Sequence, residues 1–321
     1  MEKLVLKNST LEVSRLCFGG CPLGGHGWGK TQRNELLRSV QDAYDLGINF
    51  FDTADIYGKG ESENILGEAL HGKRDKVILA SKFGVVLPQS GSNGKTYYDN
   101  SPEYIEQAIV GTLKRLNTDY LDLYQLHYRD DCTPIATVVE TLEKLKDKGI
   151  IRYFGLSNVK REEIEELKEF QNRFVSFQNE FSLATRRNED EIREIATQLN
   201  LTPMTWGSLG QGILTGKYDE STVFETDDRR SRDVYSNFYG AQIAKNLRIV
   251  QVMKEISQRT GKTMPAIAIR WILDVLKDSV VIAGIKCVAQ IEDNFQGLMW
   301  SLSEEDLHAL DVVSKEEEHA R

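Results

Sequence analysis

Short apolar runs alternate with longer amphipathic segments along most of the chain. The runs are continuously apolar, which is typical of parallel strands covered on both faces. We predict strands at Leu16–Gly20, Asn49–Thr53, Val77–Lys82, Leu121–His127, Tyr153–Ser157, Phe174–Asn179, Thr202–Trp206 and Val280–Ile285. Apolar residues at helical spacing predict helices at Glu35–Leu46, Tyr104–Leu116, Val138–Lys148 and Gln290–Leu298.

Eight strands that alternate with helices predict an α/β fold, a closed parallel (β/α)8 TIM barrel. A barrel of this kind often fills 321 residues as one domain, so we expect a single domain over residues 1–321. Three segments lie outside the alternation. Lys3–Val13 predicts an N-terminal β-hairpin at the bottom of the barrel, and Ser303–Val313 predicts an extra C-terminal helix. Gly207–Gly240 is a long polar connection, and connections of that length are usually functional or mobile.

Composition narrows the class of protein. The net charge of −9 argues against a general nucleic-acid or membrane-surface binder. The four cysteines, at positions 17, 21, 132 and 287, have no CxxC spacing, so we expect neither a disulfide framework nor a metal site. The first residues lack the apolar core of a signal peptide, and no run of about 18 apolar residues occurs. We therefore expect a soluble, cytoplasmic protein.

Four polar residues at the ends of predicted strands form the strongest candidate site. Asp52 ends one strand and Tyr57 follows it, while Lys82 and His127 end two later strands. The carboxyl ends of barrel strands meet at one face, so these side chains should lie together. An ammonium beside a phenol should lower the pKa of the phenol, and a carboxylate should keep the ammonium charged. Tyr57 is thus predicted as a general acid tuned by Asp52 and Lys82, with His127 donating a hydrogen bond to the substrate oxygen.

A glycine-rich stretch gives a competing signal. Gly24–Thr31 fits the phosphate-loop pattern GxxxxGK[ST], and with Asp52 as a magnesium ligand it would indicate a nucleoside triphosphatase. However, Cys21-Pro22-Leu23 separates the first glycine from its strand, and this reading gives Tyr57, Lys82 and His127 no role. We favour a loop at the barrel mouth, where Trp28 could wall a substrate pocket.

Carbonyl reduction by these four residues would need a hydride from a cofactor, since no side chain supplies one. Ser157, Asn158 and Gln178 end two further strands and suit the carboxamide of a nicotinamide. Trp206 ends the seventh strand, and its flat face could stack on the ring. Gly284 and Lys286 end the eighth strand, where barrels often bind phosphate.

At these residues the chain resembles the aldo-keto reductases over nearly its whole length. The resemblance is carried by Asp52–Gly58 with Glu61-Ser62-Glu63, by Leu121–His127, by Gly155–Asn158 and by Leu209–Tyr218. It is closest to the bacterial, IolS-like and voltage-channel-β-like branch. The resemblance implies a (β/α)8 barrel that binds NADPH in an extended form, with Tyr57 as general acid and base.

The resemblance also implies roles for residues along the cofactor. The 209–218 segment would strap the pyrophosphate, Lys286 would meet the 2′-phosphate, and the adenine end would lie near the helix that follows. Lys286 is the only basic residue in the segment that ends the eighth strand. A single lysine gives limited support for a 2′-phosphate, so NADH is an alternative cofactor. The cofactor-binding residues that we predict are Gly20, Ser157, Asn158, Gln178, Trp206, Ser208, Leu209, Gln211, Gly212, Lys217, Gly284, Lys286, Gln290, Asp293 and Asn294.

We expect the substrate pocket to be formed by Trp28, Phe83, Tyr128 and Arg129, with contributions from His26 and the loop around Phe238. The favoured function is an NADP(H)-dependent oxidoreductase that interconverts an aldehyde or ketone and its alcohol. An NAD(P)-dependent sugar or polyol dehydrogenase is an alternative that uses the same residues. A cofactor-bound regulatory subunit with little turnover is an alternative of a different class. The expected partner is a small carbonyl or sugar substrate, and no feature of the sequence indicates an oligomeric state.

Overall fold

The structure, a computed structural model, describes residues 1–321 except 26, 89–93, 233 and 316–321. Its centre is a closed barrel of eight parallel strands, in the order β3-β4-β5-β8-β9-β10-β11-β12. The predicted TIM barrel is therefore confirmed, and all eight predicted strands are present. Their bounds are β3 Leu16–Gly19, β4 Phe50–Asp52, β5 Ile78–Phe83, β8 Leu121–Leu126, β9 Ile151–Ser157, β10 Phe174–Glu180, β11 Thr202–Trp206 and β12 Val280–Gly284.

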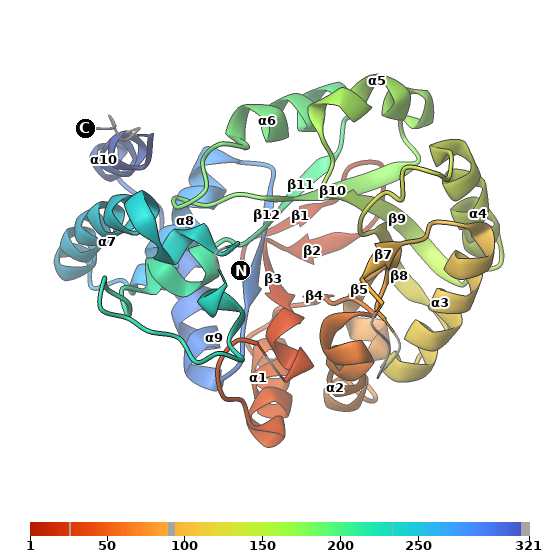
Figure 1. Ribbon diagram of the computed structural model, residues 1–321, viewed down its shortest axis with the longest axis horizontal. Coiled ribbons are helices and arrows are strands. Elements are labelled where there is room, and N and C mark those ends of the chain that lie inside the picture. The colour runs from red at the N-terminus through yellow and green to blue at the C-terminus, as the bar shows by residue number, and fades with distance from the viewer. Residues whose placement is uncertain (26, 89–93, 233, 316–321) are drawn as a thin grey trace.

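Helices surround the barrel, as Figure 1 shows. Their bounds are α1 Arg33–Asp45, α2 Glu61–Ala69, α3 Pro102–Leu116, α4 Ile135–Asp147, α5 Ile164–Leu167, α6 Glu189–Gln198, α7 Gly240–Thr260, α8 Met264–Val275, α9 Val288–Phe295 and α10 Glu304–Lys315. Helix α3 begins as its sequence predicts, because Ser101 accepts a hydrogen bond from the Tyr104 N–H and Pro102 takes the first helical position. The main apolar core lies between these helices and the outer face of the barrel.

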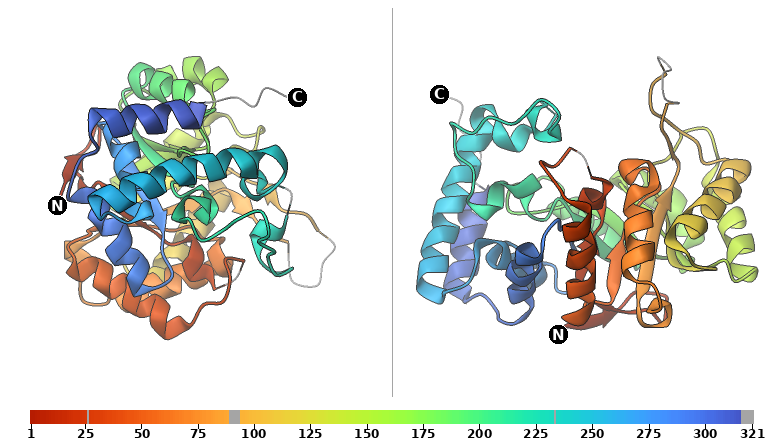
Figure 2. Two further views of the ribbon diagram at one scale, coloured as in Figure 1. Left: turned by 90° about the vertical axis from the view of Figure 1, so that its left-hand side faces the viewer. Right: turned by 90° about the horizontal axis from the view of Figure 1, so that it is seen from below.

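The N-terminal hairpin is also present. Strand β1 (Lys3–Val5) pairs antiparallel with β2 (Glu12–Ser14). The buried side chains of Leu6, Leu11 and Val13 pack with residues inside the barrel, such as Phe50 and Leu123. Figure 2 shows the hairpin at one end of the barrel, with the connection after β11 at the other. The hairpin therefore covers the end of the barrel away from the strand carboxyl termini.

A second hairpin and a long connection extend from the opposite end. Strand β6 (Val85–Val86) pairs with β7 (Tyr97–Tyr98), directly after β5. In its described residues, the connection between β11 and α7 has three 3-10 helices: η6 (Gly210–Thr215), η7 (Arg229–Ser231) and η8 (Ser236–Phe238). This long polar segment, identified from the sequence, is thus folded over the face at which the strands end (Figure 2).

Candidate active site

The loop that carries Tyr57 is fixed by close backbone contacts. After β4 the chain turns into the 3-10 helix η2 (Tyr57–Gly60), which packs on η1 (Cys21–Gly24). Gly58 has a φ of +62°, and a Cβ there would lie 2.4 Å from the carbonyl oxygen of Gly24. Only glycine fits such a position without strain. The Ser62 hydroxyl donates to the carbonyl of Gly20 at 2.7 Å, which ties the start of α2 to the end of β3.

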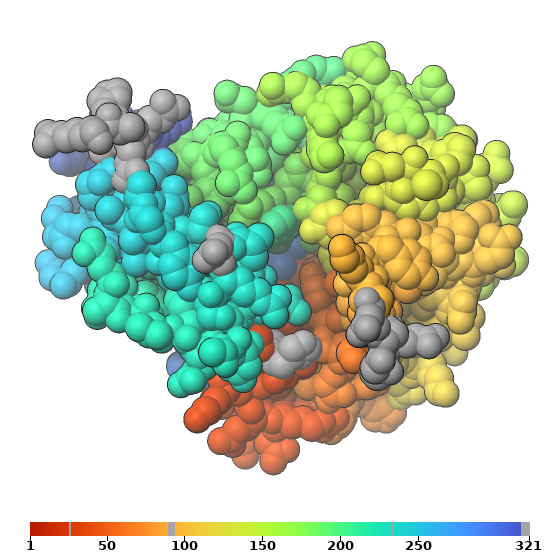
Figure 3. Space-filling model, in the orientation of Figure 1, coloured from red at the N-terminus to blue at the C-terminus, as the bar shows by residue number. Residues whose placement is uncertain are grey.

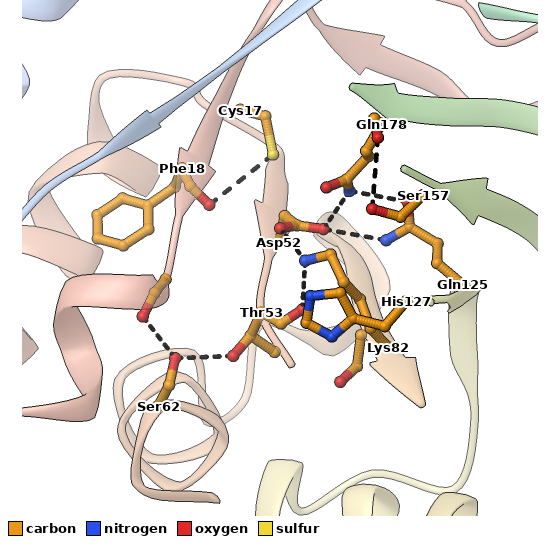
Figure 4. A network of polar contacts seen from close by, with 12 residues as sticks. Cys17, Phe18, Asp52, Thr53, Ser62, Lys82, Gln125, His127, Ser157 and Gln178 are labelled. Atoms are coloured by element: carbon orange, nitrogen blue, oxygen red, sulfur yellow. Dashed lines mark hydrogen bonds and ion pairs between the residues drawn. The ribbon is translucent and has the colours of Figure 1, made fainter. Parts of the chain in front are cut away.

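Asp52 and Lys82 form a buried ion pair beside this loop. The Lys82 ammonium donates to Asp52 Oδ2 at 2.6 Å and to the main-chain oxygen of Thr53 at 2.8 Å. The other carboxylate oxygen, Asp52 Oδ1, accepts from Gln125 Nε2 at 3.0 Å and from Gln178 Nε2 at 2.6 Å (Figure 4). A buried ion pair is tolerated when hydrogen bonds satisfy its remaining polar atoms, and this network supplies them.

Tyr57 lies beside this pair. The Lys82 ammonium is 5.2 Å from the centroid of the Tyr57 ring, and the His127 ring stands perpendicular to that ring at 6.1 Å. Burial raises the pKa of Tyr57 well above its usual value, and the neighbouring Cys21 and Asp52 add to the increase. The sequence predicted the opposite direction. The loss of hydration disfavours the phenolate more than nearby positive charge favours it.

His127 is held neutral in the same wall. Burial lowers the pKa of its imidazole well below the usual value, and the charge of Lys82 acts in the same direction. Among the described residues its Nδ1 has no hydrogen-bond partner. The ring stacks on Tyr128 at 5.1 Å, and Tyr128 stacks on Tyr98 of the β6–β7 hairpin, also at 5.1 Å. A neutral imidazole still has one N–H to donate, so His127 can act as the hydrogen-bond donor expected from the sequence.

These groups line a cavity of about 920 Å³ at the carboxyl ends of the strands. Figure 3 looks onto this face, which is hollowed between the red N-terminal segment and the connection after β11. The cavity contains every predicted catalytic residue and every predicted cofactor-binding residue. These are Asp52, Tyr57, Lys82, His127, Gly20, Ser157, Asn158, Gln178, Trp206, Ser208, Leu209, Gln211, Gly212, Lys217, Gly284, Lys286, Gln290, Asp293 and Asn294.

The predicted substrate pocket is brought together only in part. Trp28 and Tyr128 line the cavity, but Phe83 and Arg129 do not. Phe83 is fully buried against Tyr124, because its side chain points into the layer between the barrel and the helices. Arg129 turns away to pair with two carboxylates of the following segment, Glu166 at 2.6 Å and Glu163 at 3.2 Å.

Two further pocket predictions concern loops. Phe238 is buried and packs against Tyr218 and Phe224, which stabilises the connection after β11. His26 lies outside the described residues. The phosphate-loop reading of Gly24–Thr31 gains no support, since the Lys30 side chain is exposed and does not line the cavity.

Sequence reasoning missed several residues at this site. Gln125 supports Asp52, and a polar amide inside the apolar strand β8 was a signal that it faces the barrel interior. Arg229 and Arg230 also line the cavity. They belong to a dense charge run in the connection after β11, which has no apolar period from which their positions could be inferred.

The residues at the far end of the cavity fit a dinucleotide with phosphates. A Cβ at Gly29 would lie 3.3 Å from the Lys286 ammonium, 3.9 Å from a terminal nitrogen of Arg230 and 3.9 Å from Asp228 Oδ2, so two cations and one carboxylate meet there. Burial and the neighbouring Arg230 charge lower the pKa of Lys286. Asn294 is buried, and both its amide oxygen and its amide nitrogen lack a partner among the described residues. An amide with a free donor and a free acceptor matches the edge of adenine.

The described residues contain no group of three or more His, Cys, Asp and Glu side chains that could hold a metal ion. No helix among them combines the length and the apolar character needed to cross a membrane.

Comparison with known proteins agrees with this geometry. The model of the Aldo/keto reductase family matches residues 15–315. The chain belongs to the aldo/keto reductase family. Aldo-keto reductase YhdN of Bacillus subtilis is 32% identical over 316 residues, which cover 98% of this chain and 93% of YhdN. The resemblance inferred from the sequence is therefore confirmed, and family membership places the chain among oxidoreductases.

Solved structures of aldo-keto reductases are similar along the whole barrel. The glycerol dehydrogenase AKR11B4 from Gluconobacter oxydans has a TM-score of 0.87 and 31% identity, and the match covers 97% of this chain and 94% of that one. An aldo-keto reductase from Klebsiella pneumoniae, solved in complex with NADPH, has a TM-score of 0.75 and 25% identity, with coverage of 99% and 98%.

Proposed function

We propose that this protein is an NADP(H)-dependent oxidoreductase that interconverts an aldehyde or ketone and its alcohol, with Tyr57 as the proton donor and acceptor. The observation that carries the proposal is the convergence of Tyr57, the Asp52–Lys82 pair and the neutral His127 on one wall of the cavity. When bound, the nicotinamide cofactor supplies the hydride. The protein supplies the proton and the positions of the reacting groups.

The contacts of each residue in the cavity wall indicate its role in the reaction. The raised pKa keeps the Tyr57 hydroxyl protonated, so it is ready to donate to a carbonyl oxygen in the reducing direction. The N–H of His127 would orient that oxygen and stabilise negative charge as it develops. Lys82 adds a positive charge next to Tyr57, and Asp52 holds the ammonium in place. Gln125 and Gln178 act through Asp52.

The contacts of the carboxamide-binding residues refine their proposed roles. Gln178 uses its amide nitrogen for Asp52 and for Gln125 Oε1, the latter at 2.8 Å, which leaves its amide oxygen to accept from a carboxamide. Asn158 donates to the main-chain oxygen of His127 at 3.0 Å and to Ser157 Oγ at 3.1 Å. These hydrogen bonds fix the Asn158 side chain beside Ser157 at the end of β9, close to His127.

A phosphate-bearing cofactor is supported by Lys286. It has no carboxylate partner among the described residues, whereas the neighbouring Arg230 is paired with Asp228, so the lysine is the cation that favours NADPH over NADH. The Klebsiella relative in complex with NADPH supports the same choice. Titration of the protein with NADPH and NADH, followed by fluorescence, tests it. Tighter binding of NADPH is expected, and tighter binding of NADH would contradict the assignment.

A Tyr57→Phe variant tests the general acid. We expect kcat for aldehyde reduction to fall roughly 10²- to 10⁴-fold, because only the proton-donating group is removed. The Kd for NADPH should stay within twofold, since the ring remains. Tyr97→Phe, at an exposed tyrosine of the β6–β7 hairpin, is the matched control and should keep full activity. Full activity of Tyr57→Phe would refute the role of Tyr57.

A polyol dehydrogenase is the second candidate, since a glycerol dehydrogenase shares this fold closely. It would use the same residues, with Tyr57 accepting a proton from the alcohol. Assays of NADP⁺ reduction with glycerol and other polyols, set against NADPH oxidation with the matching carbonyl compounds, separate the two. A cofactor-binding subunit without catalysis predicts no turnover in either direction despite tight NADPH binding.

A further inference from the structure

Arg229 is a cation of the cavity wall that the reaction described above does not use. It begins the 3-10 helix η7, and its main-chain N–H donates to the carbonyl oxygen of Gly27 at 3.0 Å. Its side chain runs across Gly27: a Cβ at that glycine would lie 2.8 Å from Arg229 Cγ and 2.9 Å from Nε. The guanidinium is therefore held over the barrel mouth by the backbone of another loop.

Arg229 shares its cavity with Tyr57 and Cys21. Its positive charge acts on the phenol of Tyr57 and on the thiol of Cys21, and in each case it favours the ionised form. Burial of these two groups still dominates, and the pKa of each is raised. Arg229 lines the cavity together with Tyr57 and His127.

Several other charged groups of the cavity have oppositely charged partners within the protein. Lys82 pairs with Asp52, and Glu180 pairs with Arg187 at 3.3 Å and accepts from Gln211 at 3.1 Å. The neighbouring Arg230 turns to Asp228 at 2.6 Å and to the Tyr218 hydroxyl at 2.6 Å. Within the part of the chain that the structure describes, no carboxylate lies within ion-pair distance of the Arg229 guanidinium.

The walls beside Arg229 are aromatic. Trp28 and Tyr235 line the cavity as an edge-to-face pair with centroids 5.8 Å apart, and Tyr128 stacks on His127. Such walls suit an apolar spacer. A guanidinium that has no carboxylate partner among the described residues, beside aromatic walls, suits a planar carboxylate.

We infer that the substrate is an aldehyde or ketone that carries a carboxylate, and that Arg229 binds this carboxylate while the carbonyl faces Tyr57 and His127. The inference rests on the proposed reductase function and adds the substrate class. The spacer between the carbonyl and the carboxylate would lie along Trp28 and Tyr235. Arg229 is thus a specificity-determining residue and takes no part in proton transfer.

The test compares two aldehydes of the same shape, 4-carboxybenzaldehyde and its neutral counterpart 4-formylbenzamide, with NADPH as reductant. We expect the wild-type protein to prefer the carboxylate. In Arg229→Gln the kcat/KM for the carboxylate should fall roughly 10- to 100-fold, mainly through KM, because a charge-assisted hydrogen bond is lost. The kcat/KM for the amide and the KM for NADPH should change less than twofold.

Two variants complete the comparison. Arg229→Lys keeps the charge without the bidentate fork and should recover part of the preference. Arg129→Gln removes the same charge from a residue outside the cavity, paired with Glu163 and Glu166, and should match the wild type. Equal losses for both aldehydes, or a raised KM for NADPH, would show that Arg229 holds the cofactor and would overturn the inference.

A binding measurement keeps the inference separate from the proposed function. Calorimetry of the protein–NADP⁺ complex would compare 4-methylbenzoate with 4-methylbenzamide, which carry no hydroxyl group to be oxidised. Tighter binding of the benzoate by roughly tenfold or more, lost in Arg229→Gln and kept in Arg129→Gln, supports the inference even without turnover. Turnover of both aldehydes with no preference for the carboxylate, and equal binding of 4-methylbenzoate and 4-methylbenzamide, would refute the inference and leave the reductase function standing.

Discussion

Asp55, between β4 and Tyr57, is an acidic residue in an unfavourable environment. Burial raises the pKa of its carboxyl to about 7, and the nearby negative charge of Glu63 adds to the increase. Among the described residues its Oδ1 has no hydrogen-bond partner. A carboxyl of this kind prefers its neutral form, so its ionisation costs folding free energy.

The pH dependence of stability follows from the direction of this shift. The folded protein binds the Asp55 proton more tightly than the unfolded chain, so this contribution is fully present below pH 4 and is lost as pH rises to about 7. Asp55→Asn should therefore stabilise the protein at pH 8 by roughly 2 to 4 kcal/mol, and much less at pH 4. Chemical denaturation at both pH values measures the difference. Asp227→Asn, at an exposed position, is the control, and an Asp55→Asn effect equal at both pH values would contradict the prediction.

At the scale of elements, the contact between η1 and η2 positions Tyr57. Gly58→Ala should place a methyl group against the Gly24 carbonyl and strain the backbone at positive φ. We expect kcat to fall at least tenfold, because a displacement of about 1 Å can have that effect. Gly72→Ala has the same backbone strain at a φ of +74°, but nothing lies within 4 Å of its Cβ, so its kcat should be unchanged. If the two variants have equal kcat values, the contact does not position Tyr57.

The elements themselves were largely predictable from the sequence. Strand β11 has the predicted bounds, Thr202–Trp206, and the other barrel strands differ from prediction by no more than a few residues at their ends. Continuous apolar runs predict the strands, and Ser101-Pro102 predicts the start of helix α3. Arg229 was not predictable, because its position depends on a contact with Gly27 that is far away in the sequence. The raised pKa of Tyr57 also escaped prediction, since burial is a property of the folded cavity.

At the scale of the whole molecule, the N-terminal hairpin and the candidate active site lie at opposite ends of the barrel. We therefore expect the hairpin to affect stability and the cavity to affect catalysis. Leu6 of the N-terminal hairpin is 1% exposed and packs inside the barrel, away from the cavity. Leu6→Ala should lower the free energy of unfolding by about 2 to 5 kcal/mol and leave KM and kcat unchanged at 25 °C. Val5→Ala, in the same hairpin but 53% exposed, should change stability by less than about 0.5 kcal/mol. A changed KM in Leu6→Ala would contradict this separation.

Trp28 gives this enzyme a built-in optical probe. Its indole lies in the cavity wall against Tyr235, which we place beside the substrate. Its main-chain oxygen accepts from the Lys286 ammonium at 2.6 Å, so Trp28 also contacts the residue that we expect to bind the cofactor phosphate. Trp271 is fully buried in the core and Trp300 does not line the cavity, so their emission forms a constant background, whereas Trp206 also lines the cavity and contributes to the response. Excitation near 295 nm would then follow ligand entry in real time and without a label, and Trp28→Phe would identify how much of the signal comes from the mouth of the barrel.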